Sequence, residues 1–109
     1  MRLYELVTYS EKTSRWTSQF DLGFSRFTLY FSWNSQCEYW EMSVYDNDDN
    51  LIIGGIKLVV NIDLFDEYRI LKHDLPDGEL VLIPRNDKVR EITRDNLSTD
   101  YALIYSEAD

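Results

Sequence analysis

The sequence predicts an all-β fold, a small antiparallel barrel or sandwich of about seven strands with one short helix at about residues 62–69. Several short runs alternate apolar and polar residues, and clusters of Gly, Pro, Asn and Asp separate these runs. Hydrophobic residues make up 44% of the 109-residue chain and aromatic residues 15%. This composition supplies enough apolar surface for one packed core, so we expect a single folded domain.

The first part of the chain is expected to differ from the rest. Residues 1–17 predict an N-terminal arm or edge strand, and residues 18–109 a single β domain. Within the arm, residues 10–14 (SEKTS) have the composition of an exposed turn. The apolar run from Trp16 to Phe24 alternates, and it predicts a strand with Gly23 at a bulge or at a close approach of two backbones.

The centre of the predicted fold is residues 26–60, which have the pattern of two hairpins in one aromatic sheet. Apolar residues occupy every second position from Phe27 to Trp33, and this pattern resumes at Trp40 after a turn. A turn centred on Gln36 and Cys37 sets the register, because a shift by one residue would expose the whole apolar set. The predicted cross-strand pairs are Trp33 with Trp40, Phe31 with Met42, and Leu29 with Val44.

Turn residues divide the stretch after the first hairpin. Residues 46–50 (DNDDN) predict a loop, because Asp and Asn tolerate turn conformations. Gly54 and Gly55 predict a bulge inside the strand that follows and continues to Val60.

A change in the spacing of the apolar residues predicts the helix. Residues 62–69 carry acids that suit a helix start and space their apolar side chains as a helix does, with Asn61 or Asp63 as the cap. We expect about two helical turns packed on the sheet through Leu64, Phe65 and Tyr68. A Pro-Asp-Gly turn then precedes a strand at residues 79–83, and a turn at residues 94–98 precedes the last strand at residues 100–106.

The formal net charge is −9, and the acidic residues are concentrated in the middle of the chain. Such a surface repels nucleic-acid phosphates, so we expect no direct nucleic-acid binding. Between residues 38 and 67, one base (Lys57) stands against eight acids (−8 + 1 = −7): Glu38, Glu41, Asp46, Asp48, Asp49, Asp63, Asp66 and Glu67.

No apolar run reaches the length of a membrane span and no secretory signal is recognisable, so we expect a cytoplasmic protein without membrane contact.

The sharpest local motif resembles the start of a calcium-binding loop. Asp46, Asp48 and Asn50 match the first three ligand positions of an EF-hand loop. Leu51 and Lys57 stand where that loop needs a glycine and a bidentate glutamate. We therefore expect a solvated hairpin loop, and a cation bound by these carboxylates stays open as the alternative.

No other group of residues predicts catalysis. His73 is the only histidine and lacks the nucleophile context of a catalytic triad. Cys37 has no basic neighbour that would stabilise a thiolate. Strand alternation would place Glu38 and Glu41 on opposite faces, so they cannot act as a carboxylate pair. We expect no enzyme activity, no catalytic residue, no cofactor and no metal.

Three tyrosines fall on the face of the central strands that is opposite the apolar set. Tyrosine is enriched in protein interfaces, because it is large and rigid and carries a polar tip. Either a partner covers this face, or the chain's own helix or N-terminal arm does. We take Tyr30, Tyr39 and Tyr45, with Asp46 and Asp48 of the adjoining loop, as candidate protein-interface residues.

From Ser18 onward, the order of these signals resembles the bacteriophage baseplate plug family, components of contractile phage tails. The paired strands lie in FTLYFSWNSQCEYWEMSVYD, and the glycine-containing strand with its short helix in LIIGGIKLVVNIDLFDEY. LPDGELVLI resembles the family's Pro-x-Gly turn and strand, and RDNLSTDYALIYSE its closing turn and strand. These segments cover about 85 of the 109 residues in the family's order, and residues 1–17 have no counterpart.

The resemblance implies a structural virion protein, a plug at the centre of the tail baseplate. It implies contacts with the baseplate hub protein and with the tail tube or tape-measure protein, and closing of the lumen during assembly. Such a subunit would be part of a symmetric multi-subunit assembly, made and assembled in the host cytoplasm. The family transfers no catalytic residue.

The acidic stretch also fits a function of another class. A small acidic protein can mimic DNA by placing carboxylates where phosphates would be, and thereby inhibit a host nucleic-acid-binding enzyme. The sequence leaves this alternative open, because ordinary solubility explains the same charge.

Overall fold

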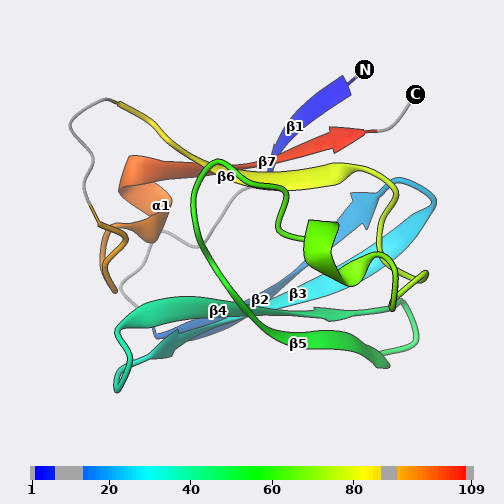
Figure 1. Cartoon of the computed structure of the whole chain (residues 1–109), viewed down its shortest axis with the longest axis horizontal. Coiled ribbons are helices and arrows are strands. Elements are labelled where there is room, and N and C mark those ends of the chain that lie inside the picture. The colour runs from blue at the N-terminus through cyan, green and yellow to red at the C-terminus, as the bar shows by residue number, and fades with distance from the viewer. Residues whose placement is uncertain (1, 7–13, 87–90, 108–109) are drawn as a thin grey trace.

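The computed structural model describes residues 2–6, 14–86 and 91–107, which form seven strands in two antiparallel sheets (Figure 1). One sheet has the strand order β1-β7-β6 and the other β2-β3-β4-β5. No closed barrel forms among these residues, so the predicted all-β fold is confirmed as two open sheets. The strands are β1 (Arg2–Leu6), β2 (Arg15–Leu22), β3 (Ser25–Asn34), β4 (Tyr39–Tyr45), β5 (Leu51–Lys57), β6 (Glu79–Pro84) and β7 (Tyr101–Glu107).

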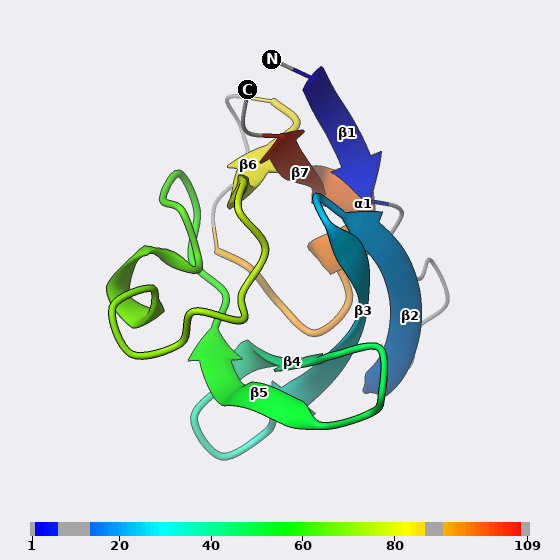
Figure 2. The ribbon, with the colours of Figure 1, turned by 90° about the vertical axis from the view of Figure 1, so that its right-hand side faces the viewer.

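The core lies between the two sheets. β2 and β3 curve toward the three-stranded sheet, so the four-stranded sheet wraps around one side of the interior (Figure 2). Side chains of β4 alternate residue by residue between the core and the outer face, and those of β3 do so from Phe27 to Ser32. The core includes Leu29, Phe31, Trp40, Met42 and Val44 of β3 and β4, and Leu80, Leu82, Leu103 and Tyr105 of β6 and β7.

The β3–β4 hairpin has the predicted register. Trp33 lies opposite Trp40, and their rings pack edge to face with centroids 5.7 Å apart. Trp16 of β2 adds a third indole, 5.0 Å from the Trp40 ring. Aromatic pairs of this geometry stabilise a sheet beyond the area that they bury. The other predicted pairs are also confirmed: Phe31 with Met42, and Leu29 with Val44.

Asn34 builds the turn of this hairpin. Its side-chain Oδ1 accepts hydrogen bonds from the backbone N–H groups of Gln36 and Cys37, at 3.1 and 3.0 Å. The N–H of Glu38 donates to the Asn34 carbonyl at 2.7 Å. Glu38 itself has a positive φ of 57°, so it ends the turn and β4 begins one residue later. A short side chain that bonds local backbone therefore fixes the register.

The predicted strand from Trp16 to Phe24 is two residues too long. β2 ends at Leu22, and Gly23 and Phe24 form the turn to β3. Gly23 has a φ of +69°, which an L side chain rarely adopts, and Phe24 is 61% exposed instead of belonging to the core set. Gly23 therefore serves the turn, not a bulge within a strand, and its close neighbour is a side chain: a Cβ there would lie 3.0 Å from the Tyr105 hydroxyl and 3.8 Å from the backbone nitrogen of Asp77.

The glycine pair of β5 forms the predicted irregularity. The register between β4 and β5 shifts around Val44, where Gly54 and Gly55 stand between the paired residues of β5. β5 ends at Lys57 instead of continuing to Val60. Residues 58–65, which we call the crossing segment, run from β5 to the other sheet, where Val60 forms a bridge with Leu82 of β6.

The predicted helix at residues 62–69 is only a 3-10 turn, η1 (Asp66–Tyr68). Residues before it are held by β6 instead: the N–H of Leu64 donates to the carbonyl of Leu80 at 2.7 Å. A helix cannot begin where the backbone already pairs with a strand. Leu64 and Phe65 are buried in the core and Tyr68 is half-buried, as predicted.

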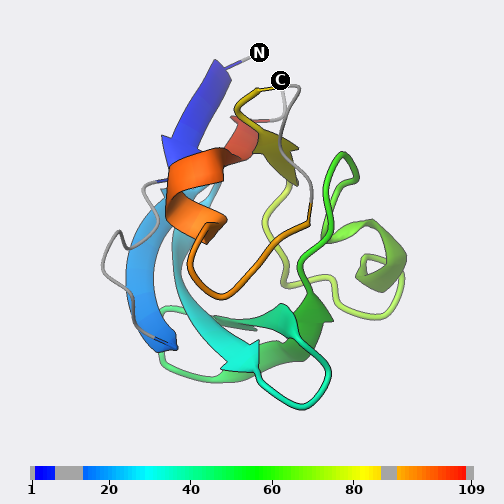
Figure 3. The ribbon, with the colours of Figure 1, turned by 90° about the vertical axis from the view of Figure 1, so that its left-hand side faces the viewer.

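The predicted turn at residues 94–98 contains one turn of α-helix, α1 (Leu97–Asp100). Figure 3 shows this turn and the segment before it across one end of the space between the sheets. Leu97 is buried there, and the indole N–H of Trp40 donates to the Thr93 carbonyl at 3.0 Å. The segment therefore closes one end of the core.

β1 is an edge strand of the three-stranded sheet and pairs with β7, so the described ends of the chain lie side by side (Figure 1). The predicted turn at residues 10–14 lies outside the described residues except for Ser14. Within the part of the chain that the structure describes, no helix has the length and apolar character that a membrane crossing requires.

Candidate functional site

The candidate interface is the outer face of the four-stranded sheet. Tyr30 of β3 and Tyr39 and Tyr45 of β4 all point to this face, and each is half-buried. η1 lies beside the end of β5, and β1 belongs to the other sheet, so neither lies over the outer face of β3 and β4 (Figures 1 and 2). Among the described elements, the face is open to a partner.

The register brings two of the three tyrosines together. Tyr30 lies opposite Ser43, which places Tyr45 at the diagonal position two residues along. Side chains at such positions are about 7–8 Å apart, within reach of two aromatic rings. Leu51 of β5 lies opposite Tyr45 and is 56% exposed. The sequence analysis did not count Leu51 with this face, although its place after the loop would have put it beside Tyr45.

Tyr39 stands apart from this pair, in a polar group. It lies opposite Asn34, four residues from Tyr30 along β3, which corresponds to about 13 Å of strand. The Asn34 amide donates to Glu41 at 3.4 Å, and the Lys57 ammonium sits 5.0 Å from the centre of the Tyr39 ring. A hydrogen bond with the Glu41 carboxylate, with smaller effects of burial and negative charge, raises the pKa of Tyr39.

The Asp46 carboxylate organises the loop beside Tyr45. Its Oδ1 accepts hydrogen bonds from the backbone N–H groups of Asp48 and Asn50, both at 2.9 Å, and its Oδ2 accepts from the Asn50 amide. The backbone hydrogen bond from Asn50 is the main cause of the lowered pKa of Asp46. The carboxylate is thus turned inward to its own loop, whereas Asp48 is exposed.

Other residues considered for chemistry lie apart from one another. His73 and Cys37 are both exposed, on different loops, and Glu38 lies in the β3–β4 turn while Glu41 lies on the strand. Among the residues that the structure describes, no group of three or more His, Cys, Asp or Glu side chains is placed to hold a metal ion.

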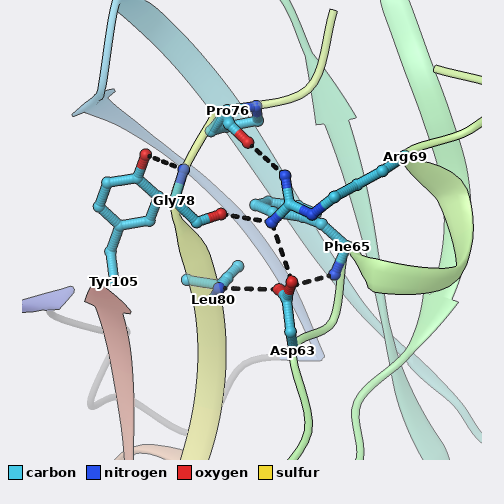
Figure 4. Close-up of polar contacts among 7 residues, drawn as sticks. All are labelled: Asp63, Phe65, Arg69, Pro76, Gly78, Leu80 and Tyr105. Carbon is cyan, nitrogen blue, oxygen red and sulfur yellow. Dashed lines mark hydrogen bonds and ion pairs between the residues drawn. The ribbon is translucent and has the colours of Figure 1, made fainter. Parts of the chain in front are cut away.

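The sequence analysis missed a clamp between the crossing segment and β6 (Figure 4). The Arg69 guanidinium bonds to the Asp63 carboxylate at 2.9 Å and to the carbonyls of Pro76, at 2.8 Å, and Gly78. Asp63 also accepts from the backbone N–H of Leu80 at 3.0 Å and from that of Phe65 at 3.2 Å. The only sequence signal was an aspartate and an arginine six positions apart, which many exposed loops share.

Comparison with known proteins gives one family. The family model described as "Cyanophage baseplate Pam3 plug gp18" matches residues 4–108. The match includes residues 4–17, for which the sequence analysis found no counterpart. A search of curated proteins finds no match.

Proposed function

The chain belongs to the cyanophage baseplate plug family, and on that premise we propose that it is the plug of a contractile phage tail, binding the central hub and closing the lumen. The family match carries this proposal, because it spans 105 of the 109 residues, from 4 to 108. Membership gives a structural role in the baseplate of the virion tail. The proposal adds hub binding, contact with the tail tube or tape-measure protein, and assembly in the host cytoplasm.

The outer face of the four-stranded sheet is the proposed surface for the hub. Tyr30, Tyr45 and Leu51 offer a contiguous apolar area, and Tyr39 adds an aromatic ring with polar neighbours. Interfaces commonly combine buried aromatic anchors with a polar rim. Asp48 of the adjoining loop is exposed and can supply part of that rim.

Hub binding can be tested by capture on immobilised hub protein of the same phage. We expect the double variant Tyr39→Ala, Tyr45→Ala to bind about tenfold or more weakly, because aromatic anchors dominate binding energy. Its thermal midpoint should change little, since both side chains lie outside the core. Tyr4→Ala, on the other sheet, is the matched control and should bind as the unaltered chain does. A hub that does not retain the unaltered chain would refute hub binding.

Closing of the lumen can be tested on assembled tails. We expect tails made without this chain to lack density at the centre of the baseplate in electron micrographs and to lose their lumen contents early. Supplying the chain in trans should restore both. Tails that keep full central density and full contents without the chain would show that another subunit closes the lumen.

No observation favours the DNA mimic. Asp46 and Asp63, two carboxylates of the acidic stretch, are hydrogen-bonded within the chain and stabilise a turn and the clamp. The proposed structural role requires no catalytic step and no cofactor from this chain.

A further inference from the structure

A second surface, distinct from the tyrosine face, is an open groove of about 760 Å3. It lies between the end of β5 and η1, which Figure 2 shows beside each other. Its lining comes from the last residues of β5, from the crossing segment together with η1, and from the first residue of β6. We call it the β5 groove. Its lining residues are Gly55, Ile56, Lys57, Val59, Ile62, Asp63, Leu64, Asp66, Glu67, Tyr68 and Glu79.

Part of the β5 groove is apolar and open to solvent. Ile62 is 53% exposed, and Val59 is only partly buried against the core. Gly55 leaves its wall without a side chain, and nothing lies within 4 Å of the place where a Cβ would be. Another backbone can therefore come close to the wall at this position.

The wall formed by β5 is a strand edge. Among the strands that the structure describes, β4 is the only neighbour of β5 in the sheet. The outer edge of β6 differs, because the crossing segment covers it through bridges from Val60 to Leu82 and from Asp63 to Val81. A strand edge beside a groove can accept a further strand, which gains backbone hydrogen bonds there.

The net negative charge of the β5 groove favours a positively charged ligand. Its lining has four carboxylates and one ammonium group, that of Lys57 (−4 + 1 = −3). Asp63 is neutralised by Arg69, and the Lys57 ammonium lies over the Tyr39 ring. Three exposed carboxylates therefore set the sign of the rim: Asp66, Glu67 and Glu79.

We propose that the β5 groove binds an extended basic segment of a neighbouring baseplate protein, which adds to β5 as a further strand. Side chains alternate along a strand, so one set of the segment would cover Val59 and Ile62 and the other would present Lys or Arg to the carboxylates. An acidic segment would be repelled. The identity of the neighbour rests on the proposed function, whereas the chemistry of the segment rests on the groove alone.

The test uses synthetic peptides of about 10 residues, the upper length of a typical strand. Overlapping peptides from the hub, tube and tape-measure proteins of the same phage are titrated into the full chain. We expect the peptides that bind to be basic and to alternate apolar with charged residues. Binding should weaken by about tenfold or more in the variant Glu67→Lys, Glu79→Lys, and should weaken as salt is added.

The matched control is Asp48→Lys, which makes the same kind of charge reversal on an exposed loop residue outside the β5 groove. It should bind these peptides nearly as well as the unaltered chain. Amide NMR signals of Gly55, Ile56 and Lys57 should shift on binding, while those of Tyr30 and Tyr45 should not. Thermal melts of all variants check that the exposed substitutions leave the fold intact.

Three results would overturn the inference: no peptide binds, the peptides that bind are acidic, or the groove variant binds them unchanged. None of these results would affect the capture of the chain on whole hub protein through the tyrosine face. Conversely, loss of hub capture with intact peptide binding would refute the hub proposal and leave the β5 groove as a binding site.

Discussion

Gly78→Ala is expected to destabilise the chain by about 3–5 kcal/mol, the range of severe single substitutions. A Cβ at Gly78 would collide with the carbonyl oxygen of Ser106 and lie 2.7 Å from a ring carbon of Tyr105. Backbone and a buried ring cannot move aside cheaply, because both belong to β7 in the middle of its sheet. The Tyr105 hydroxyl also accepts the N–H of Gly78 at 2.9 Å, so a shift of either group breaks this bond.

Gly54→Ala is the matched control for this prediction. The three atoms nearest to a Cβ at Gly54 would be side-chain atoms of Ser43 and Leu51, the nearest at an ordinary contact distance of 3.6 Å. Its φ lies outside the left-handed region, so alanine is tolerated and the free energy of unfolding should change by less than about 1 kcal/mol. Urea denaturation of both variants gives the comparison. Equal stability of the two variants would mean that β6 and β7 are less tightly packed than this structure indicates.

The sequence predicted best where short-range patterns decide the structure. The β3–β4 register followed from the alternation of apolar residues and from one turn, and Asn34 fixes that turn by bonding its own neighbours. The bulge at Gly54 and Gly55 is equally local. Such features depend on a few adjacent residues, which the sequence displays directly.

Predictions were less accurate where distant segments compete for the same backbone. Residues 62–69 have the local pattern of a helix, but the N–H of Leu64 donates to β6. The helical part is therefore only η1. Val60 likewise leaves the predicted strand, because it forms a bridge with Leu82 of β6. Pairing partners so far apart in the chain leave no periodic signal that could have predicted them.

For the candidate interface too, the sequence predicted the local features but not those that depend on contacts between segments. Alternation correctly placed three tyrosines on the outer face, because that depends only on strand period. It did not predict that Tyr30 and Tyr45 adjoin while Tyr39 stands apart, which follows from the register. The β5 groove was not predicted at all, since its lining comes from segments of β5, η1 and β6 that the path of the crossing segment brings together.

Asp63→Ala is expected to cost about 2–4 kcal/mol, because it removes three contacts of one partly buried carboxylate. The Arg69 guanidinium would keep only its two carbonyl partners, and the N–H of Leu80 would lose its acceptor. The side chains of Asp63 and Arg69 are 12% and 30% exposed, so water can replace only part of what is lost. This estimate lies below the cost of breaking a fully buried pair for the same reason.

Two further variants separate the contributions of Asp63. Asp63→Asn keeps an oxygen that can accept from Leu80 but loses the ion pair with Arg69, so its loss in urea denaturation should be about half that of alanine. Asp66→Ala, an exposed neighbour, should be nearly neutral. Because Asp63 ties one wall of the β5 groove to β6, its alanine variant should also weaken peptide binding while the chain is still folded. Full peptide affinity in this folded variant would show that the groove does not depend on the clamp for its shape.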